Sequence, residues 1–319
     1  MQILLIGATG QLGLELLRSL PAHGPVVAAA RSGVSTRGVR QANLANSDQL
    51  RALVRDVQPE IIINAAAYTA VDAAESDVEA ARAANELGPA VLAEEAARLR
   101  IPLIHYSTDY VFDGSGDTAW REEDPIAPLN VYGQSKAAGE AAIRASGAAH
   151  LILRTSWVYG LGGRNFVNKM FALRERDELT VVADQWGAPT STRFLAEVTS
   201  RLLSRVGQKP GFFAQHGGTL HVVCGGRTSW HGVAAEIFRQ LAEMDPALHT
   251  PRVRPIASSE FPTPARRPLN SQLSTERLIS EFSITPPAWQ TELNRNLVEL
   301  YSEYTGSLPQ QAQSGRETS

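Results

Sequence analysis

The chain has 319 residues, of which 43% are hydrophobic, and a formal net charge of −3. A chain of this length and apolar content can bury a sizeable core, as one large domain or as two closely packed lobes. The slightly acidic balance, without an extended basic block, argues against a nucleic-acid partner, and no apolar stretch approaches the length of a membrane span.

The first half of the chain alternates short apolar runs with longer amphipathic segments. The short runs are rich in Ile, Val and Leu at consecutive positions, which is typical of strands covered on both faces. They are Ile3–Ile6, Val26–Ala30, Ile61–Ala65, Leu103–Tyr106 and Leu151–Leu153. Helical periodicity is found between them, in Gln11–Leu20, Ser47–Val57, Val78–Arg100 and Gly133–Ala145. This alternation predicts right-handed βαβ units, and therefore an α/β fold with a doubly wound, parallel, Rossmann-like sheet.

The second half is less regular. Its patterns predict helices at Phe166–Arg174, Phe194–Ser204, Trp230–Met244, Thr275–Ser280 and Trp289–Tyr301. Two further apolar runs predict strands, at Leu179–Ala183 and Leu220–Val223. The proline-rich segment 249–268 is expected to be dominated by loops. Together these elements predict a smaller, interleaved C-terminal α/β substrate lobe.

We expect three parts in the chain. Residues 1–155 would form a dinucleotide-binding domain, to which the segments around 176–190 and 219–244 would return. Residues 156–305 would form the substrate lobe, and 306–319 a polar, flexible tail. Cys224, the only cysteine, excludes an intrachain disulfide, and the apolar run at the N-terminus is too short for a signal peptide. We therefore expect a cytoplasmic protein in which Cys224 is a small buried side chain rather than a nucleophile.

A glycine triplet follows the first predicted strand and opens the first helix. Gly7 would permit the tight turn, Gly10 would let the backbone approach a pyrophosphate, and Gly13 would let the helix pack against the sheet. The helix N-terminus would offer free N–H groups to the phosphates. The spacing G-x-x-G-x-x-G differs from the usual G-x-G-x-x-G, but its place between strand and helix favours a dinucleotide site, in which we include Gln11 and Leu12.

The end of the second strand indicates which cofactor is used. NAD enzymes usually place an acid there to bind the ribose 2′-hydroxyl, and this chain has Arg31 and Ser32 instead. Either these residues meet a 2′-phosphate or Arg31 is a solvated loop residue. We predict NADPH, with NADH still possible. The expected cofactor contacts also include Asn43 and Leu44, together with three residues that follow the third strand: Ala66, Ala67 and Tyr68.

Tyr132 and Lys136 form a Y-x-x-x-K motif. Residues four apart share a helix face, which would place the lysine charge beside the phenol. A nearby positive charge lowers the pKa of a phenol, so Tyr132 could give a proton to a carbonyl oxygen as hydride reaches the carbon. Thr108 ends the fourth strand, where it could polarise that carbonyl, although strand-end capping is the alternative. The glycine triplet, the hydroxyl at the end of the fourth strand and the Y-x-x-x-K motif follow one another along the chain in the expected order. We therefore assign Tyr132, Lys136 and Thr108 as catalytic.

The chain resembles the extended short-chain dehydrogenases/reductases, and within them the dTDP-4-dehydrorhamnose reductase family. The resemblance extends from residue 3 to about residue 300. The matching segments are 7–13, 64–72, 107–112, 130–136, 154–159 and 262–268. The last three of these belong to the subfamily rather than to the superfamily.

The resemblance implies reduction of the C4 keto group of dTDP-4-dehydro-β-L-rhamnose to dTDP-L-rhamnose, a precursor of cell-surface polysaccharides. Tyr132 would donate the proton, and Lys136 would activate it and bind the cofactor ribose. Thr108 and Asp109 would contact the sugar. Trp157 would pack against the sugar, unless it is a core residue. One of the adjacent arginines, Arg266 and Arg267, would bind the diphosphate, and the other would be structural.

Some members of the family are dimers bridged by magnesium through glutamates. Glu15 lies at one of the expected positions, but Arg193 and Gln290 align with the other two. An arginine repels a metal and a glutamine is a weak ligand, so we expect no metal and no metal-bridged dimer. A monomer and a homodimer both remain open.

Three other functions are alternatives to this one. A sugar-nucleotide epimerase or 4,6-dehydratase would have the same fold, but dehydratases typically have Asp-Glu after the threonine, where this chain has Asp109 and Tyr110. A non-catalytic, NADP-binding regulatory subunit would not need the whole proton-transfer set, and here the set is complete. A generic NADP-binding protein of the atypical type would commonly lack the Y-x-x-x-K motif.

Overall fold

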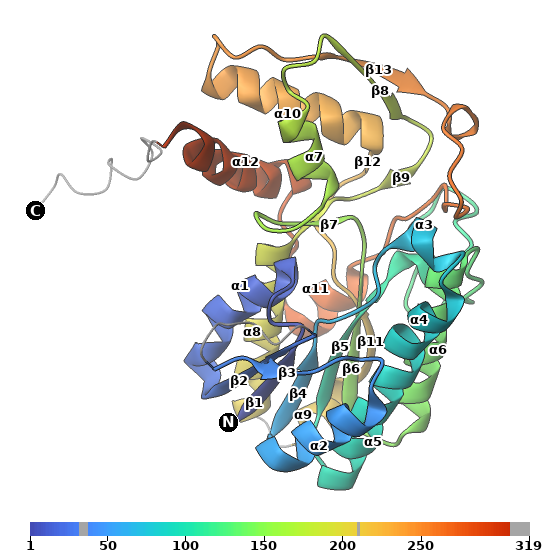
Figure 1. Ribbon diagram of the computed structural model, residues 1–319, viewed down its shortest axis with the longest axis vertical. Coiled ribbons are helices and arrows are strands. Elements are labelled where there is room, and N and C mark those ends of the chain that lie inside the picture. The colour runs from blue at the N-terminus through green and yellow to red at the C-terminus, as the bar shows by residue number, and fades with distance from the viewer. Residues whose placement is uncertain (32–37, 209–210, 307–319) are drawn as a thin grey trace, which may run out of the picture.

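The computed structural model describes residues 1–31, 38–208 and 211–306. The larger lobe is built on a seven-stranded sheet in the order β11-β6-β5-β4-β1-β2-β3, with every neighbouring pair parallel (Figure 1). The strands are β1 (Ile3–Ile6), β2 (Val26–Ala30), β3 (Arg40–Gln41), β4 (Ile61–Asn64), β5 (Leu103–Thr108), β6 (His150–Thr155) and β11 (Gly218–His221). The strand order reverses between β1 and β4, so the carboxyl ends of these strands border the crevice where open α/β sheets bind ligands. The predicted doubly wound sheet is confirmed.

Helices cover both faces of the sheet (Figure 1). Side chains alternate along a strand, so Ile3 and Leu5 belong to one apolar cluster and Leu4 and Ile6 to another. The first cluster includes side chains of α1 (Gln11–Ser19), α8 (Thr192–Gln208), α9 (Phe212–His216) and α11 (Glu276–Phe282). The second includes side chains of α2 (Ser47–Val57), α5 (Gly88–Leu99) and α6 (Val131–Ala145).

The second lobe lies beyond the carboxyl ends of the strands, at the top of Figure 1. Its helices are α7 (Phe166–Ala172), α10 (Trp230–Met244) and α12 (Trp289–Thr305). Its strands form three pairs: β8 (Glu178–Val182) with β13 (Arg252–Ile256), β7 (Val158–Tyr159) with β10 (Thr190–Ser191), and β9 (Trp186–Gly187) with β12 (Thr228–Ser229). Short helical segments complete the described chain: η1 (Leu20–His23), α3 (Val71–Ala74), α4 (Val78–Arg82), η2 (Ala83–Leu87), η3 (Asp109–Val111) and η4 (Ser258–Glu260).

Two predicted elements differ from the structure. The single helix expected over 78–100 is divided into α4, the π-helical segment η2 and α5. The segment 249–268, expected to be dominated by loops, also contains the short strand β13, because a proline is tolerated in a strand that is paired on one side only.

Of the two segments expected to return to the first domain, only one contributes a strand to the main sheet. β11 joins the main sheet beside β6, but β8, inside 176–190, pairs with β13 in a separate sheet. The expected tail lies outside the described residues from position 307 onward. In the part of the chain that is described, no helix is both long and apolar enough to cross a membrane.

Candidate active site

The glycine triplet forms the turn from β1 into α1, beside the carboxyl end of β4. Gly7 has φ +89°, and a Cβ there would lie 2.6 Å from the Ala66 nitrogen. A Cβ at Gly13 would lie 2.1 Å from the Gly7 carbonyl oxygen. At Gly10, in contrast, the only atom near an added Cβ is that same oxygen, at 3.4 Å. The protein's own packing requires Gly7 and Gly13, whereas Gly10 leaves an open cradle at the start of α1 that fits a pyrophosphate.

Two further residues of the predicted cofactor site lie in the first turn of α1. Gln11 bridges to the second lobe, since its Nε2 donates to the Val158 carbonyl at 3.4 Å and its Oε1 accepts from Asn165 at 3.3 Å. Leu12 is buried in the core. The first turn of α1 is therefore attached both to the sheet and to the second lobe.

Three predicted cofactor residues lie near the carboxyl ends of β2 and β3. Arg31 directly follows β2 and is exposed, while Ser32 lies outside the described residues. Asn43 and Leu44 precede α2, where Asn43 accepts from the Ala45 nitrogen at 3.1 Å and Leu44 is buried. The exposed guanidinium of Arg31 is available to an anion at this edge of the crevice.

The segment after β4 is held by a residue that the sequence did not single out. Asn85, in η2, accepts from the Tyr68 nitrogen at 2.8 Å and donates to the Tyr68 carbonyl at 3.0 Å. The same amide nitrogen lies 3.0 Å from the Ser135 hydroxyl on α6. Ala66 and Ala67 precede this clamp and are partly exposed toward the crevice side of the strand end. Asn85 thus connects the predicted cofactor loop to the helix that carries Tyr132.

Helix α6 presents Tyr132 in its first turn and Lys136 one turn later. Asn130 caps the helix by accepting from the Gly133 nitrogen at 2.8 Å, and its amide donates to the Arg266 carbonyl at 2.8 Å. Tyr132 is half-buried and Lys136 is buried. The cap therefore ties the start of α6 to the 262–268 loop.

Lys136 binds strand β5 rather than the phenol. Its Nζ donates to the Tyr106 carbonyl at 2.6 Å and lies 3.2 Å from His105 Nε2. Burial lowers the pKa of Lys136 to about 8, and the charge of Glu140 acts in the opposite direction. Burial raises the pKa of Tyr132, opposed by a hydrogen bond with Thr108. We expected the lysine charge to lower the tyrosine pKa, but in the cofactor-free chain burial has the larger effect.

Thr108 and Asp109 stand together at the end of β5. The Thr108 hydroxyl donates to Asp109 Oδ1 at 3.1 Å and accepts from the Tyr110 nitrogen at 3.2 Å. Burial raises the pKa of Asp109 to about 6, although hydrogen bonds with Ser271 and Thr108 lower it. Oδ2 of Asp109 is buried without a hydrogen-bond partner among the described residues. An oxygen of this kind is suited to a ligand hydroxyl, because an unpaired buried acceptor is costly.

Trp157 lies where the two lobes meet. Its ring stacks on that of Trp230, with centroids 3.8 Å apart and an angle of 16° between the planes. Its backbone is in the left-handed region, at φ 49°, and a Cβ at Gly187 would lie 2.9 Å from its ring. The side chain is half-buried. One part of Trp157 therefore packs against the protein and the remainder is accessible to a ligand.

The structure separates the roles of the two adjacent arginines. Arg267 donates to Asp72 at 2.7 Å and to the Tyr110 hydroxyl at 3.0 Å. The side chain of Arg266 is exposed and makes no hydrogen bond or ion pair with the rest of the described chain. Arg267 thus holds the loop in place, whereas Arg266 has only a charge interaction with Asp113 among the described residues.

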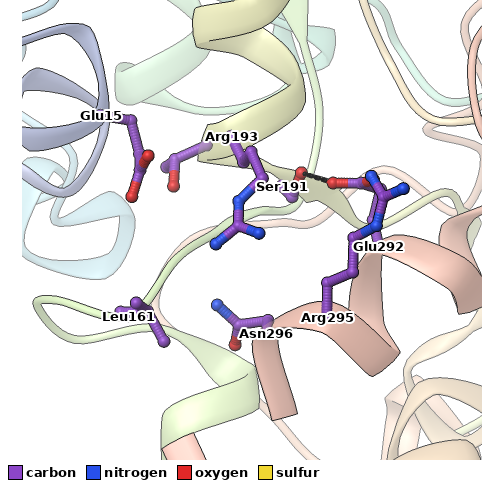
Figure 2. Close-up of a pocket in the computed structure, with 8 residues that line it drawn as sticks. Glu15, Leu161, Ser191, Arg193, Glu292, Arg295 and Asn296 are labelled. Atoms are coloured by element: carbon purple, nitrogen blue, oxygen red, sulfur yellow. Dashed lines mark hydrogen bonds and ion pairs between the residues drawn. The ribbon is translucent and has the colours of Figure 1, made fainter. Parts of the chain in front are cut away.

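We expected no metal at Glu15, Arg193 and Gln290, the positions that align with the magnesium bridge of other family members. Glu15 lies in a polar pocket between α1, β10 and α12 (Figure 2). Arg193 lines the same pocket, whereas Gln290 does not line it and is exposed; the other charged residues of the pocket are Glu292 and Arg295. Glu292 accepts from the Ser191 hydroxyl at 2.6 Å, and Figure 2 shows the Arg193 side chain reaching into the space between Glu15 and Asn296. Within the described ranges, no three His, Cys, Asp or Glu side chains gather as metal ligands.

Three buried polar residues near the site were missed by sequence reasoning: His105, Glu140 and Arg154. Arg154 forms two hydrogen bonds with Glu140, at 2.9 and 2.7 Å, and both residues are almost fully buried. None of the three belongs to a spacing motif. The only signal was a charged or polar residue inside a predicted strand or helix, which does not name its partner.

The fold and this site define an extended short-chain dehydrogenase/reductase. A family model described as RmlD substrate binding domain matches residues 1–302, and the chain belongs to that family. A dTDP-4-dehydrorhamnose reductase of Shigella flexneri is 42% identical over 303 residues, covering 95% of this chain and 99% of that protein. One from Burkholderia thailandensis is 42% identical over 306 residues, covering 95% and 100%.

A solved structure agrees with these sequence relatives. The dTDP-4-dehydrorhamnose reductase of Bacillus anthracis, in complex with NADP, superposes with a TM-score of 0.83 and 32% identity, covering 93% of this chain and 99% of that one. The resemblance stated from the sequence is confirmed.

Proposed function

We propose that this enzyme reduces the C4 keto group of dTDP-4-dehydro-β-L-rhamnose to give dTDP-L-rhamnose. The observation that carries the proposal is the clustering of Tyr132, Thr108 and Asp109 at the carboxyl end of β5, in a chain with 42% identity to reductases of that name. When bound, the nicotinamide cofactor supplies the hydride. The protein binds and orients the sugar and delivers the proton.

Tyr132 is the proposed proton donor to the sugar oxygen. Its hydroxyl interacts with Thr108, which is held in turn by the Tyr110 nitrogen. The raised pKa of the phenol keeps its proton in place until a negative charge develops on the sugar oxygen. The unpartnered oxygen of Asp109 is proposed to accept from a neighbouring sugar hydroxyl, and the accessible part of Trp157 to pack against the sugar ring.

Arg266 is the proposed ligand of the substrate diphosphate. Its exposed guanidinium makes no hydrogen bond with the described residues, while Arg267 binds Asp72 and Tyr110. A guanidinium matches phosphate oxygens in geometry and charge. The Asn130 amide positions the Arg266 backbone, so the diphosphate would be held at a fixed distance from the start of α6.

NADPH is the proposed cofactor, with NADH usable at lower efficiency. The exposed Arg31 at the end of β2 stands where an acid would select NAD. The relative from Bacillus anthracis was solved with NADP, which supports the same choice. For this chain we propose residues 1–155 as the cofactor domain, residues 156–305 as the substrate lobe, and a monomer or homodimer without a metal bridge.

A coupled assay tests this function. dTDP-4-keto-6-deoxyglucose is supplied with a 3,5-epimerase, and the absorbance of NADPH or NADH is followed with the purified chain. We expect stoichiometric loss of the reduced cofactor and formation of dTDP-L-rhamnose. A regulatory subunit would be silent in this assay, and an epimerase or dehydratase would convert sugar without net loss of cofactor.

A further inference from the structure

A continuous chain of hydrogen bonds joins the cofactor loop to Lys136. Asn64 Oδ1 accepts from the Ala66 nitrogen at 3.2 Å, and Asn64 Nδ2 lies 3.0 Å from His105 Nδ1. His105 Nε2 lies 3.2 Å from Lys136 Nζ, which donates to the Tyr106 carbonyl at 2.6 Å. Asn64, His105 and Lys136 are all buried, with exposed fractions of 0, 0 and 2%. Each polar atom must therefore be satisfied by its neighbour in the chain.

The first bond determines the direction of the others. A backbone nitrogen only donates, so the Asn64 atom that faces Ala66 is the amide oxygen. The amide nitrogen then faces His105, and it also only donates. His105 Nδ1 must therefore be the acceptor and carry no proton.

The position of the histidine proton follows from that result. A neutral imidazole with a bare Nδ1 carries its hydrogen on Nε2. Burial is the main reason that the pKa of His105 lies well below its usual value, so the ring does not take a second proton whatever the charge of Lys136. The Nε2–H group consequently points at Lys136 Nζ.

Only one protonation state of Lys136 fits this arrangement. An ammonium has three donors and no acceptor, so an N–H of Lys136 would face the Nε2–H of His105, and neither could accept. A neutral amine has a lone pair that accepts from His105, and hydrogens that donate to the Tyr106 carbonyl. The other ionised groups near Lys136 are Glu140 on the same helix and its partner Arg154 on β6, which bind each other.

We propose that His105 is a positioning residue that, held by Asn64, stabilises the neutral amine form of Lys136 relative to the ammonium form before the cofactor binds. Charging Lys136 requires a coupled change: the His105 proton moves from Nε2 to Nδ1, the Asn64 amide turns over, and the Ala66 N–H loses its acceptor. Ala66 packs directly against Gly7 in the glycine cradle. A ligand that accepts from the Ala66 N–H would therefore favour the charged lysine, which couples cofactor binding to the lysine that the proposed reduction uses.

Lysine-selective NMR of the full-length, cofactor-free chain tests this without any turnover. Lysine occurs only at positions 136, 169 and 209, so a sample labelled at lysine Cε gives three signals. Lys169 is exposed and serves as the internal reference. We expect Lys136 to be neutral above a midpoint of about 8. In His105→Gln, the amide can turn its oxygen toward Nζ, and the Lys136 midpoint should rise by roughly one pH unit or more, a tenfold change in the protonation equilibrium.

Two controls keep the result interpretable. His150→Gln replaces a histidine at the amino end of β6, away from the site, and should leave the Lys136 midpoint unchanged. Circular dichroism establishes that each variant is folded. A folded His105→Gln chain with the wild-type midpoint would overturn the proposal.

The histidine tautomer gives an independent measurement. In a sample labelled at the ring nitrogens of histidine, assigned by comparison with His105→Gln, we expect His105 to carry its proton on Nε2 at a pH of about 9 or above, where Lys136 is neutral. A proton on Nδ1, or on both nitrogens, would contradict the proposal. Because these spectra need no substrate, an enzyme that fails the coupled assay but shows the expected tautomer and midpoint would refute the proposed function and leave this inference intact.

Discussion

The guanidinium of Arg267 lies 2.7 Å from a carboxylate oxygen of Asp72, and this ion pair ties the 262–268 loop to the segment that follows β4. The other carboxylate oxygen of Asp72 accepts from the Ala265 nitrogen at 3.3 Å. One acidic side chain therefore organises the loop, and the neighbouring Arg266 is left to act on a ligand.

Replacing each arginine in turn should separate binding from folding. We expect Arg266→Ala to raise KM for the sugar nucleotide by roughly tenfold to a hundredfold, as for loss of a charged hydrogen bond of about 1.5–3 kcal/mol, with little change in kcat or in Tm. Arg267→Ala should instead lower Tm. Steady-state kinetics and thermal unfolding of both variants check this. A KM effect confined to Arg267→Ala would reverse the assignment.

The glycine cradle offers a matched pair of substitutions. Gly10→Ala should fold with a Tm close to that of the wild type, because its Cβ has room and its φ of −75° suits alanine. It should weaken NADPH binding by at least about tenfold, since the methyl group occupies the space left for phosphate. Gly13→Ala should be destabilised by about 1–3 kcal/mol, because its Cβ meets the backbone of the β1–α1 turn. Fluorescence titration and denaturant unfolding are the measurements, and wild-type affinity in Gly10→Ala would exclude the cradle.

Tyr132→Phe should lose turnover without losing structure. The ring packs edge-on against Tyr110 with centroids 5.5 Å apart, a contact that phenylalanine preserves. We expect kcat to fall by about a hundredfold or more, the usual contribution of general acid catalysis, while Tm and NADPH affinity stay near wild type. Undiminished NADPH oxidation in the coupled assay would show that another group supplies the proton.

Arg31→Asp should shift the cofactor preference toward NADH. A carboxylate would repel a 2′-phosphate and would accept from a ribose 2′-hydroxyl. The ratio of kcat/KM for NADPH to that for NADH should fall by at least about tenfold. Arg18→Asp, which changes an exposed arginine on α1, is the charge-matched control and should leave the ratio unchanged. If Arg31 is only a solvated loop residue, both variants will keep the wild-type ratio.

The buried pair Glu140–Arg154 predicts a pH dependence of stability. Burial by itself raises the pKa of Glu140, but the hydrogen bonds and charge of Arg154 outweigh it, so the net shift is downward. A carboxyl with a lowered folded-state pKa stabilises the fold above the unfolded value of about 4.3, and this contribution is lost as pH falls through the folded pKa.

Glu140→Gln should therefore be destabilised by about 3–5 kcal/mol at neutral pH, since it leaves Arg154 buried without its counter-charge. Its stability should also depend less on pH below about 5 than that of the wild type. Urea unfolding at a series of pH values measures both effects. Glu197→Gln, which breaks an exposed pair with Arg201, should stay within about 1 kcal/mol of the wild type.

Local patterns predicted those parts of the fold whose signals lie close together in the sequence. Ser47–Val57 and Trp230–Met244 begin and end where they were expected, because each has strong amphipathic periodicity and a polar N-cap, Asn46 and Ser229. The break at Ala83–Leu87 was not predicted, because it depends on Asn85 reaching across to Tyr68.

The residues of the candidate site were likewise predicted only where they belong to local sequence motifs. The glycines, Tyr132 and Thr108 belong to motifs, and they were named in advance. The role of His105 can be recognised only in the folded chain, where β4, β5 and α6 come together. Its partners Asn64 and Lys136 are 41 and 31 positions away in the sequence. The distinction between Arg266 and Arg267 likewise depends on Asp72, which is 195 positions from Arg267.

The strand that completes the main sheet, β11, is supplied by chain that has already passed through β7–β10 of the second lobe. A fragment that stops at residue 155 would leave the apolar strand β6 as an open edge, ready to recruit strands from other molecules. The two lobes of this enzyme therefore cannot be exchanged between relatives as separate contiguous segments. A folded chimera would have to include Gly218–His221 together with the first six strands. Any change of sugar specificity must therefore be made without separating the two lobes.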